Sequence, residues 1–124
     1  MTQLTGKIIW VLDDFGYFGN HIPKEDTTEH TVSKIKFAII QEHMIKFQTD
    51  PVEYQGEQFA YNVNLNINDK GTHYTGSFSE VTDSDWTGKV SCELFENGKV
   101  FFIYGEWIED ETFYTWLARI DKVK

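Results

Sequence analysis

The residue types that carry catalysis and metal binding are present but scattered along the chain. There are four histidines, His21, His30, His43 and His73, and a single cysteine, Cys92. No two of the histidines have the spacing that places zinc ligands on one helix face, and one thiol alone does not make a metal cluster. Neither a Gly-x-Ser-x-Gly nucleophile elbow nor a glycine-rich phosphate loop occurs. We therefore predict no catalytic site, no metal site and no cofactor.

Acidic groups are the most abundant chemistry in the sequence. There are 20 Asp and Glu residues against 11 Lys and Arg residues, which gives a formal net charge of -9. A negative field of this size repels nucleic-acid phosphates and anionic lipids, so we expect no direct nucleic-acid binding and no membrane association. The charge favours a cationic partner instead.

Size and composition predict one globular domain spanning residues 1–124. Hydrophobic residues make up 40% of the chain and aromatic residues 16%, which is enough for a core. Cys92 has no partner for an intrachain disulfide, which fits a reducing compartment. We therefore expect a cytoplasmic protein.

Alternating apolar and polar residues predict strands through the second half of the chain. From Gln58 to Asn68 every second residue is apolar, which is the period of a half-buried strand. Turn residues follow at 68–71, and a second alternating segment completes a hairpin. Asn97-Gly98 is a strong hairpin signal, since type I′ turns need positive φ at both central residues.

The segment 32–48 is ambiguous between strand and helix. Alternation around Ile35 and Phe37 favours two strands, whereas Val32, Ile35, Ile39 and His43 would share one face of a helix. We favour strands and keep a helix near residues 28–48 as the alternative.

These patterns predict an all-β fold, an up-and-down antiparallel meander. Eight strands are expected, at residues 7–12, 32–41, 43–49, 57–68, 72–81, 86–96, 99–107 and 112–123. Eight strands are enough for a meander to close into a small barrel and so remove its edges. The alternative is a half-barrel of seven strands with one helix over its open side.

The last two predicted strands, residues 99–107 and 112–123, are apolar on both faces. Their second faces need a cover from the long segment before residue 32 or from another chain. We therefore predict that the chain can pair with itself as a homodimer.

Trp10 lies in the first predicted strand, Arg119 lies in the last, and Leu4-Thr5-Gly6-Lys7 stands at the beginning. Together with eight short strands and a long first connection, this pattern resembles the calycin group, which includes the lipocalins and avidins. In that group a tryptophan near the first strand often packs beneath a basic residue of the last. The resemblance thus implies a small β-barrel with Trp10 beneath Arg119, and it transfers no site residue.

The predicted loops separate the charges of the chain between the two ends of the barrel. Successive loops of a meander alternate between its ends, and one end collects most of the acidic residues and, of the bases, only Lys24. We call this the acidic end. Its connections are residues 13–31, 50–57, 80–86 and 106–112.

Aromatic residues stand among the acids of the acidic end, where such side chains serve as interface anchors. Acidic side chains in loops can simply be solvated by water. When many of them gather at one end, however, their mutual repulsion costs stability, and a cationic partner would neutralise it. The predicted partner-binding residues are Asp13, Asp14, Glu80, Asp83, Asp85, Trp86, Glu106, Trp107, Glu109, Asp110 and Glu111.

Two classes of function fit this sequence. In the first, the acidic end occludes a basic protein, such as a nuclease or another nucleic-acid-binding enzyme, in the manner of bacterial immunity proteins and phage-encoded inhibitors. In the second, the barrel binds a small ligand, preferably a cation or amine, that enters through the acidic mouth beneath residues 13–31. Bulky inward residues such as Tyr61 and Phe78 predict a filled interior, so we prefer the protein-binding function. An enzyme of unknown type is the third interpretation.

Overall fold

Ten β-strands make up the part of the chain that the computed structural model describes, which is residues 4–12, 30–54, 56–68, 70–71 and 73–122. The strands are β1 (Leu4–Leu12), β2 (His30–Gln41), β3 (Met44–Thr49), β4 (Val52–Tyr54), β5 (Glu57–Phe59), β6 (Tyr61–Ile67), β7 (Tyr74–Glu80), β8 (Asp83–Asn97), β9 (Val100–Glu109) and β10 (Thr112–Asp121). The described residues include no helix long and apolar enough to cross a membrane.

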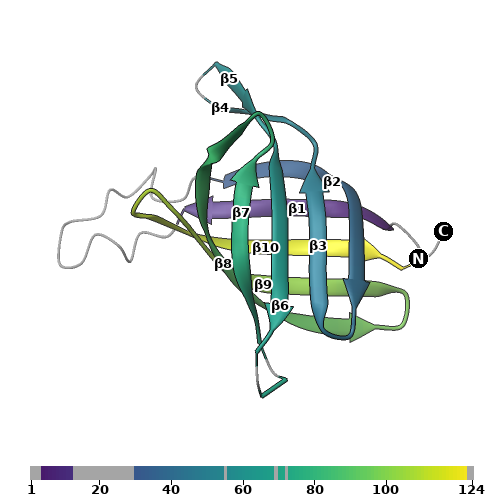
Figure 1. The fold of residues 1–124 in the computed structure, drawn as a ribbon. Helices are drawn as coiled ribbons and strands as arrows, with labels where there is room; N and C mark the ends of the chain where they lie inside the picture. Colours follow the sequence, from purple (N-terminus) through teal and green to yellow (C-terminus); the bar gives the residue numbers. More distant parts are fainter. Residues whose placement is uncertain (1–3, 13–29, 55, 69, 72, 123–124) are drawn as a thin grey trace, which may run out of the picture.

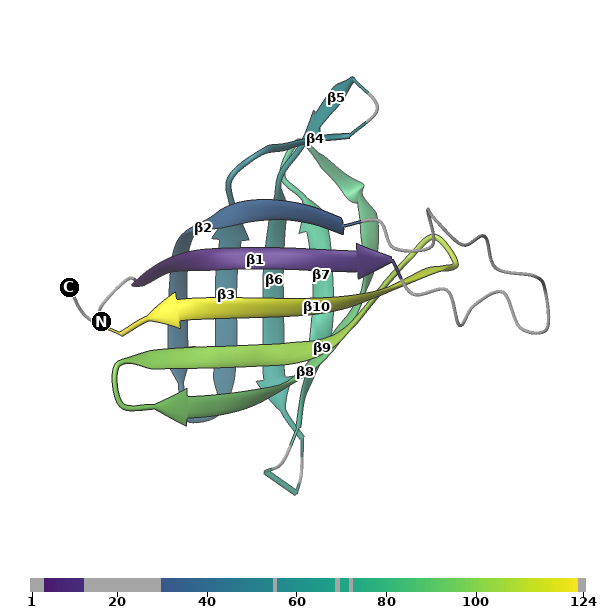
Figure 2. The same ribbon diagram turned by 180° about the vertical axis from the view of Figure 1, so that it is seen from behind.

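Eight of the strands close into a barrel in the order β1-β10-β9-β8-β7-β6-β3-β2, and all neighbours are antiparallel. Figure 1 shows β9, β10 and β1 crossing behind β7, β6 and β3 at a steep angle, and Figure 2 shows the same crossing from the other side, with these three strands in front. The predicted all-β meander is confirmed. The half-barrel is wrong, because β1 pairs with both β10 and β2 and leaves no open side for a helix to cover.

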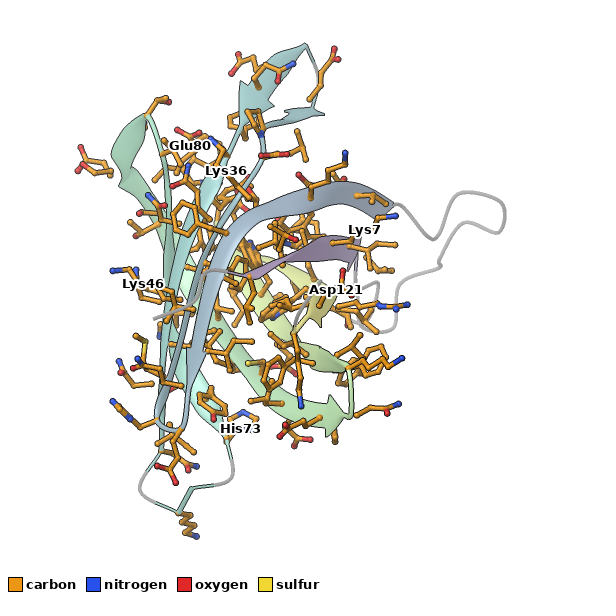
Figure 3. The ribbon with its side chains drawn as sticks, turned by 90° about the vertical axis from the view of Figure 1, so that its right-hand side faces the viewer. Lys7, Lys36, Lys46, His73, Glu80 and Asp121 are labelled. Carbon is orange, nitrogen blue, oxygen red and sulfur yellow. The ribbon has the colours of Figure 1, made fainter. Side chains whose placement is uncertain are left out.

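The ambiguous segment forms two strands. β2 and β3 pair from Gln41 opposite Met44 back to Ile35 opposite Thr49, around a turn at residues 42–43. The helix near residues 28–48 is therefore wrong over its described part. Ile45 and Phe47 face the core, while Lys46 between them points outward from β3 (Figure 3). That alternation is what the period of two in the sequence reports.

Residues 50–60 contain a hairpin that the sequence pattern did not predict. β4 and β5 pair with each other outside the barrel, at the top of Figure 1. The single strand expected at residues 57–68 is consequently split at Ala60. The reason is local hydrogen bonding, since the Ala60 amide donates to Glu80 Oε2 at 3.0 Å and its carbonyl accepts from the Val81 amide at 2.8 Å.

Two hairpin turns differ in detail from expectation. Asn97 pairs with Val100, so the central residues of that turn are Gly98 and Lys99, and only Gly98 has positive φ, at 47°. Glycine at the first central position is the type II′ arrangement. β9 also continues past residue 107, and its turn to β10 consists of Asp110 and Glu111, with φ of 51° and 67°.

The core is organised around the ring of Trp107, which is 1% exposed. It stacks on Phe78 with 4.5 Å between ring centroids and 14° between planes. Trp10, Tyr61 and Trp116 meet it edge to face at 5.4 to 6.0 Å. Such aromatic pairs add about 0.5–1.5 kcal/mol each beyond the burial of their area.

Two glycines near these rings occupy positions where a Cβ atom would not fit. A Cβ atom on Gly88 would lie 2.3 Å from the Phe78 ring, and one on Gly105 would lie 1.8 Å from the Ser91 carbonyl oxygen. Trp116 pairs with Gly105 across β9 and β10, and its indole Nε1 donates to the Ser91 and Glu106 carbonyls, both at 3.2 Å. A side chain on residue 105 would therefore collide with the backbone of β8 at Ser91 and Cys92.

The outer wall of β8, β9 and β10 exposes large apolar side chains, as the doubly apolar pattern predicted. They are Phe95, Phe102, Tyr104, Phe113 and Leu117. Whether the segment before residue 30 covers them lies outside the described residues, and the homodimer stays a prediction.

The contact implied between Trp10 and Arg119 is wrong. Trp10 pairs with Trp116 and faces the core, whereas Arg119 pairs with Lys7 and points outward. The Arg119 guanidinium is exposed and lies 3.7 Å from Asp121. Figure 3 shows Lys7 and Asp121 together on this outer side of the barrel.

Glu80 ties the base of the β4–β5 hairpin to the turn after β7. It is 4% exposed, and its carboxylate accepts bonds from the Ala60 amide, the Thr82 amide and the Thr82 hydroxyl. Burial by itself raises the pKa of Glu80, but the hydrogen bonds from Thr82, Ala60 and Asp83 outweigh it and hold the pKa below its ordinary value.

We predict that Gly105→Ala lowers the free energy of unfolding by about 1–3 kcal/mol, because the added methyl must displace the backbone of β8. Urea unfolding measures the change. Ser77→Ala, on the exposed face of β7, is the control and should behave like the parent protein. Equal stability of the two variants would contradict the packing described here.

We predict that Glu80→Gln lowers the free energy of unfolding by about 1–3 kcal/mol at pH 7, because the charged acceptor of several buried bonds is lost. Since the folded-state pKa of Glu80 is depressed, its contribution is complete above the ordinary glutamate pKa of 4.5 and is lost as the pH falls through the folded-state value. The gap between parent and variant should therefore narrow in acid. Denaturant titrations from pH 7 to acid test this, with the exposed Glu53→Gln as control.

Candidate functional site

A pocket lies at the acidic end of the barrel, where β1, β9 and β3 end and β2, β6, β8 and β10 begin. It encloses about 110 Å³. We call it the aromatic pocket, and its lining residues are Trp10, Thr31, Val52, Phe59, Tyr61, Trp86, Trp107, Glu109 and Tyr114. Sites for drug-sized ligands enclose about 300–1,000 Å³, so this one suits a compact chemical group.

The alternation of β9 places the two central groups of the pocket together. Trp107 and Glu109 are two residues apart on one strand and therefore share its inner face. Trp107 forms the boundary between the filled core and the pocket, and Glu109 lies beyond it toward the acidic end. Phe59 of the β4–β5 hairpin meets Trp86 of β8 at 5.4 Å between centroids and forms part of the opposite wall.

Among the described residues that line the aromatic pocket, Glu109 is the only acid. Its Oε2 accepts the indole N–H of Trp86 at 2.6 Å, and its Oε1 accepts the indole N–H of Trp107 at 3.1 Å. A side-chain hydrogen bond also joins it to Tyr61. Burial, followed by the negative charge of Glu109, raises the pKa of Tyr61, so the hydroxyl keeps its proton and acts as a donor.

A buried polar atom lies in the wall of the aromatic pocket. Trp10 is 5% exposed, and its indole Nε1 has no hydrogen-bond partner among the described residues. Most buried donors in native proteins have an acceptor. We therefore expect this N–H to donate to an acceptor atom of a ligand, to water or to a residue outside the described ranges.

A shallower hollow adjoins the aromatic pocket and shares Trp86 and Glu109 with it. It encloses about 310 Å³, and the other residues lining it are Asp83, Asp85, Thr87 and Asp110. The three aspartates are exposed, and none of the ion pairs between described residues involves them. We call these three residues the rim aspartates.

The structure brings some of the predicted partner-binding residues together and separates others. Trp86, Trp107 and Glu109 come together in the aromatic pocket, and the rim aspartates lie beside them. Glu111 is exposed in the β9–β10 turn, while Glu106 points outward from the wall of β9. Glu80 is buried in its structural network and lies at the opposite end of β7 from His73 (Figure 3). Asp13 and Asp14 lie outside the described residues.

Sequence reasoning missed part of the site. Trp10, Phe59, Tyr61 and Tyr114 are not among the predicted partner-binding residues, yet they line the pocket. The available signal was position, since each is an aromatic near the strand end that faces the acidic loops. The predicted lid, residues 13–31, lies outside the described residues except for His30 and Thr31, and Thr31 lines the pocket.

Within the described residues no three His, Cys, Asp or Glu side chains lie close enough to hold a metal ion. Cys92 is fully buried, and burial, with a smaller effect from Glu93, raises the pKa of its thiol to about 12. The reactive thiolate form is therefore scarce at neutral pH.

Comparison with known proteins shows a shared fold. No family model and no curated protein matches this sequence. A redesigned β-barrel aligns over 97% of this chain and 90% of its own, with a TM-score of 0.57 and 5% identity. A single-residue mutant of the vaccine antigen transferrin-binding protein B from Haemophilus parasuis Hp5 aligns over 100% of this chain, with a TM-score of 0.53 and 10% identity, and this chain spans 30% of its length. At these identities the likeness is one of architecture, that of a small β-barrel.

Proposed function

We propose that this protein is a calycin-like barrel that binds a compact organic cation in the aromatic pocket. The observation that carries the proposal is the pairing of a mainly aromatic lining with one carboxylate, that of Glu109. Aromatic faces attract cations by about 0.5–2 kcal/mol each, more where water is excluded. The carboxylate adds a fixed negative charge, and the net charge of -9 raises the local concentration of cations.

The filled core below the pocket supports a small ligand over a large one. Phe47, Phe78 and Trp116 occupy the interior at mid-barrel, and Trp107 closes it toward the acidic end. A ligand of the size that lipocalin-type barrels hold along their axis therefore has no room here. The available volume matches a head group rather than a whole drug-sized molecule.

We predict that choline binds more tightly, by about tenfold or more, than its neutral analogue in which a carbon atom replaces the nitrogen. The two have the same shape, so the difference measures charge recognition. Isothermal titration calorimetry gives both dissociation constants. Equal affinity for the two would contradict cation binding.

Two variants locate this binding. Glu109→Gln keeps the size of the side chain and removes its charge, so it should weaken choline binding by about tenfold. Phe113→Leu removes an exposed ring from the outer wall of β10 and serves as the matched control, with unchanged affinity expected. If the control loses as much affinity for choline as Glu109→Gln does, choline does not bind specifically in the aromatic pocket.

A second candidate function is occlusion of a basic protein by the acidic end, as in an inhibitor or immunity protein. The rim aspartates favour it, because they are exposed beside a half-exposed tryptophan and make no ion pair with a described residue. Unneutralised charges around an aromatic anchor are a common arrangement at interfaces with cationic partners.

For this second function we predict that the triple variant Asp83→Lys, Asp85→Lys and Asp110→Lys loses a basic partner that salt releases from the parent protein. Native mass spectrometry after gentle purification from the source cells compares the two proteins. A second triple variant, Glu42→Lys with Glu93→Lys and Glu96→Lys, changes exposed acids away from the rim and controls for the same change in net charge. Retention of the same partner by the triple variant would exclude the rim aspartates as the contact.

A further inference from the structure

We infer that the cation bound in the aromatic pocket is fully alkylated, a quaternary ammonium group, rather than a primary ammonium. This inference rests on the proposed function and specifies its ligand class. Two quantities decide between the two kinds of ammonium group. One is the number of hydrogen-bond acceptors in the pocket that are still free, and the other is the number of N–H donors that each kind carries.

The acceptor capacity of Glu109 is largely used by the walls of the pocket. A carboxylate offers about four lone-pair sites. The indole N–H groups of Trp86 and Trp107 occupy one on each oxygen, at 2.6 Å and 3.1 Å, and Tyr61 occupies a third. The charge of Glu109 therefore acts on a ligand mainly through space, with little capacity left to accept its N–H groups.

A primary ammonium brings three N–H donors that need acceptors once water is removed. Apart from Glu109, the described side chains lining the aromatic pocket are hydrocarbon, aromatic ring, indole N–H, and the hydroxyl groups of Thr31, Tyr61 and Tyr114, which are weaker acceptors for a cation than a carboxylate is. A quaternary ammonium has no N–H group, and its methyl groups carry the positive charge directly against ring faces. The lining thus satisfies the quaternary ion without any hydrogen bond.

A primary ammonium also gains little by displacing the indole N–H groups that already donate to Glu109. To reach Oε1 of Glu109 it must replace the indole N–H of Trp107, a residue that is 1% exposed. That N–H would then be buried without a partner, which costs more than an ordinary hydrogen bond returns. Trp86 is 39% exposed and can turn to water, so at most two of the three ammonium N–H groups can reach Glu109 while Trp107 and Tyr61 keep their hydrogen bonds.

The test compares choline with ethanolamine, which differ only in the three methyl groups on nitrogen. Both are titrated into ¹⁵N-labelled protein, and the indole N–H signals of Trp86 and Trp107 report binding at Glu109 itself. We expect both signals to shift with choline, with a dissociation constant at least about tenfold below that for ethanolamine.

Tyr61→Phe provides a variant whose effect is specific to this inference. Removal of the hydroxyl frees an acceptor site on Glu109 while keeping the ring that packs on Trp107. We expect the preference for choline over ethanolamine to fall by severalfold, mainly through tighter ethanolamine binding. A variant that was merely less stable would weaken both ligands together, and thermal unfolding identifies that case.

The outcomes separate the inference from the proposed function. Ethanolamine binding as tightly as choline overturns the inference and leaves a cation site in place. Absence of any shift with either ligand overturns both. Binding of choline alone, with the preference reduced in Tyr61→Phe, establishes the quaternary site.

A quaternary ammonium group can come from a free metabolite or from a trimethylated lysine side chain, and the same experiment distinguishes them. A basic peptide with one trimethyllysine is titrated beside choline. Tighter binding of the peptide that disappears in Asp83→Asn with Asp85→Asn identifies the side chain, because the rim aspartates would then contact the rest of the peptide. Equal affinities identify the free head group.

Discussion

The fold and the candidate site both depend on the ring of Trp107. Below it, the ring stacks on Phe78, which is possible because residue 88 is a glycine. Above it, the indole N–H donates to Glu109 and so fixes the carboxylate in the pocket wall. One side chain thus ends the hydrophobic core and begins the candidate site. A change in core packing at Phe78 or Trp116 therefore moves the floor of the pocket.

Much of the barrel follows from simple periodicity. The alternation around Tyr61 to Ile67 and the apolar inner face of β9 predict strands, their inward faces and the end at which their acidic loops gather. The β4–β5 hairpin does not follow, because strands of three residues are too short to show a period, and this pair is set by the buried bonds of Glu80. The outward position of Arg119 depends on its register with Lys7, and register depends on how the barrel closes.

The sequence predicts the part of the candidate site that lies on one strand and does not predict the part that several strands bring together. Trp107 and Glu109 are neighbours on one strand face, so sequence alone brings them together. Trp10, Tyr61 and Tyr114 join them from three other strands, and the strand order and register of the closed barrel bring these residues together. The aromatic pocket and the shallower hollow share Trp86 and Glu109, so a ligand in one would contact residues that also line the other.

The closing ladder between β1 and β10 has a consequence for how the protein matures. Trp10 and Tyr114 line the same pocket but belong to strands far apart in the chain, and β1 has only β2 beside it until β10 is synthesised. Contacts between such distant segments form late in folding. A nascent chain on the ribosome therefore lacks the pocket. A ligand of this pocket would bind only barrels whose β1–β10 ladder has closed. A bound ligand would in turn slow the reopening of that seam and protect the protein from proteolysis at its last-formed ladder.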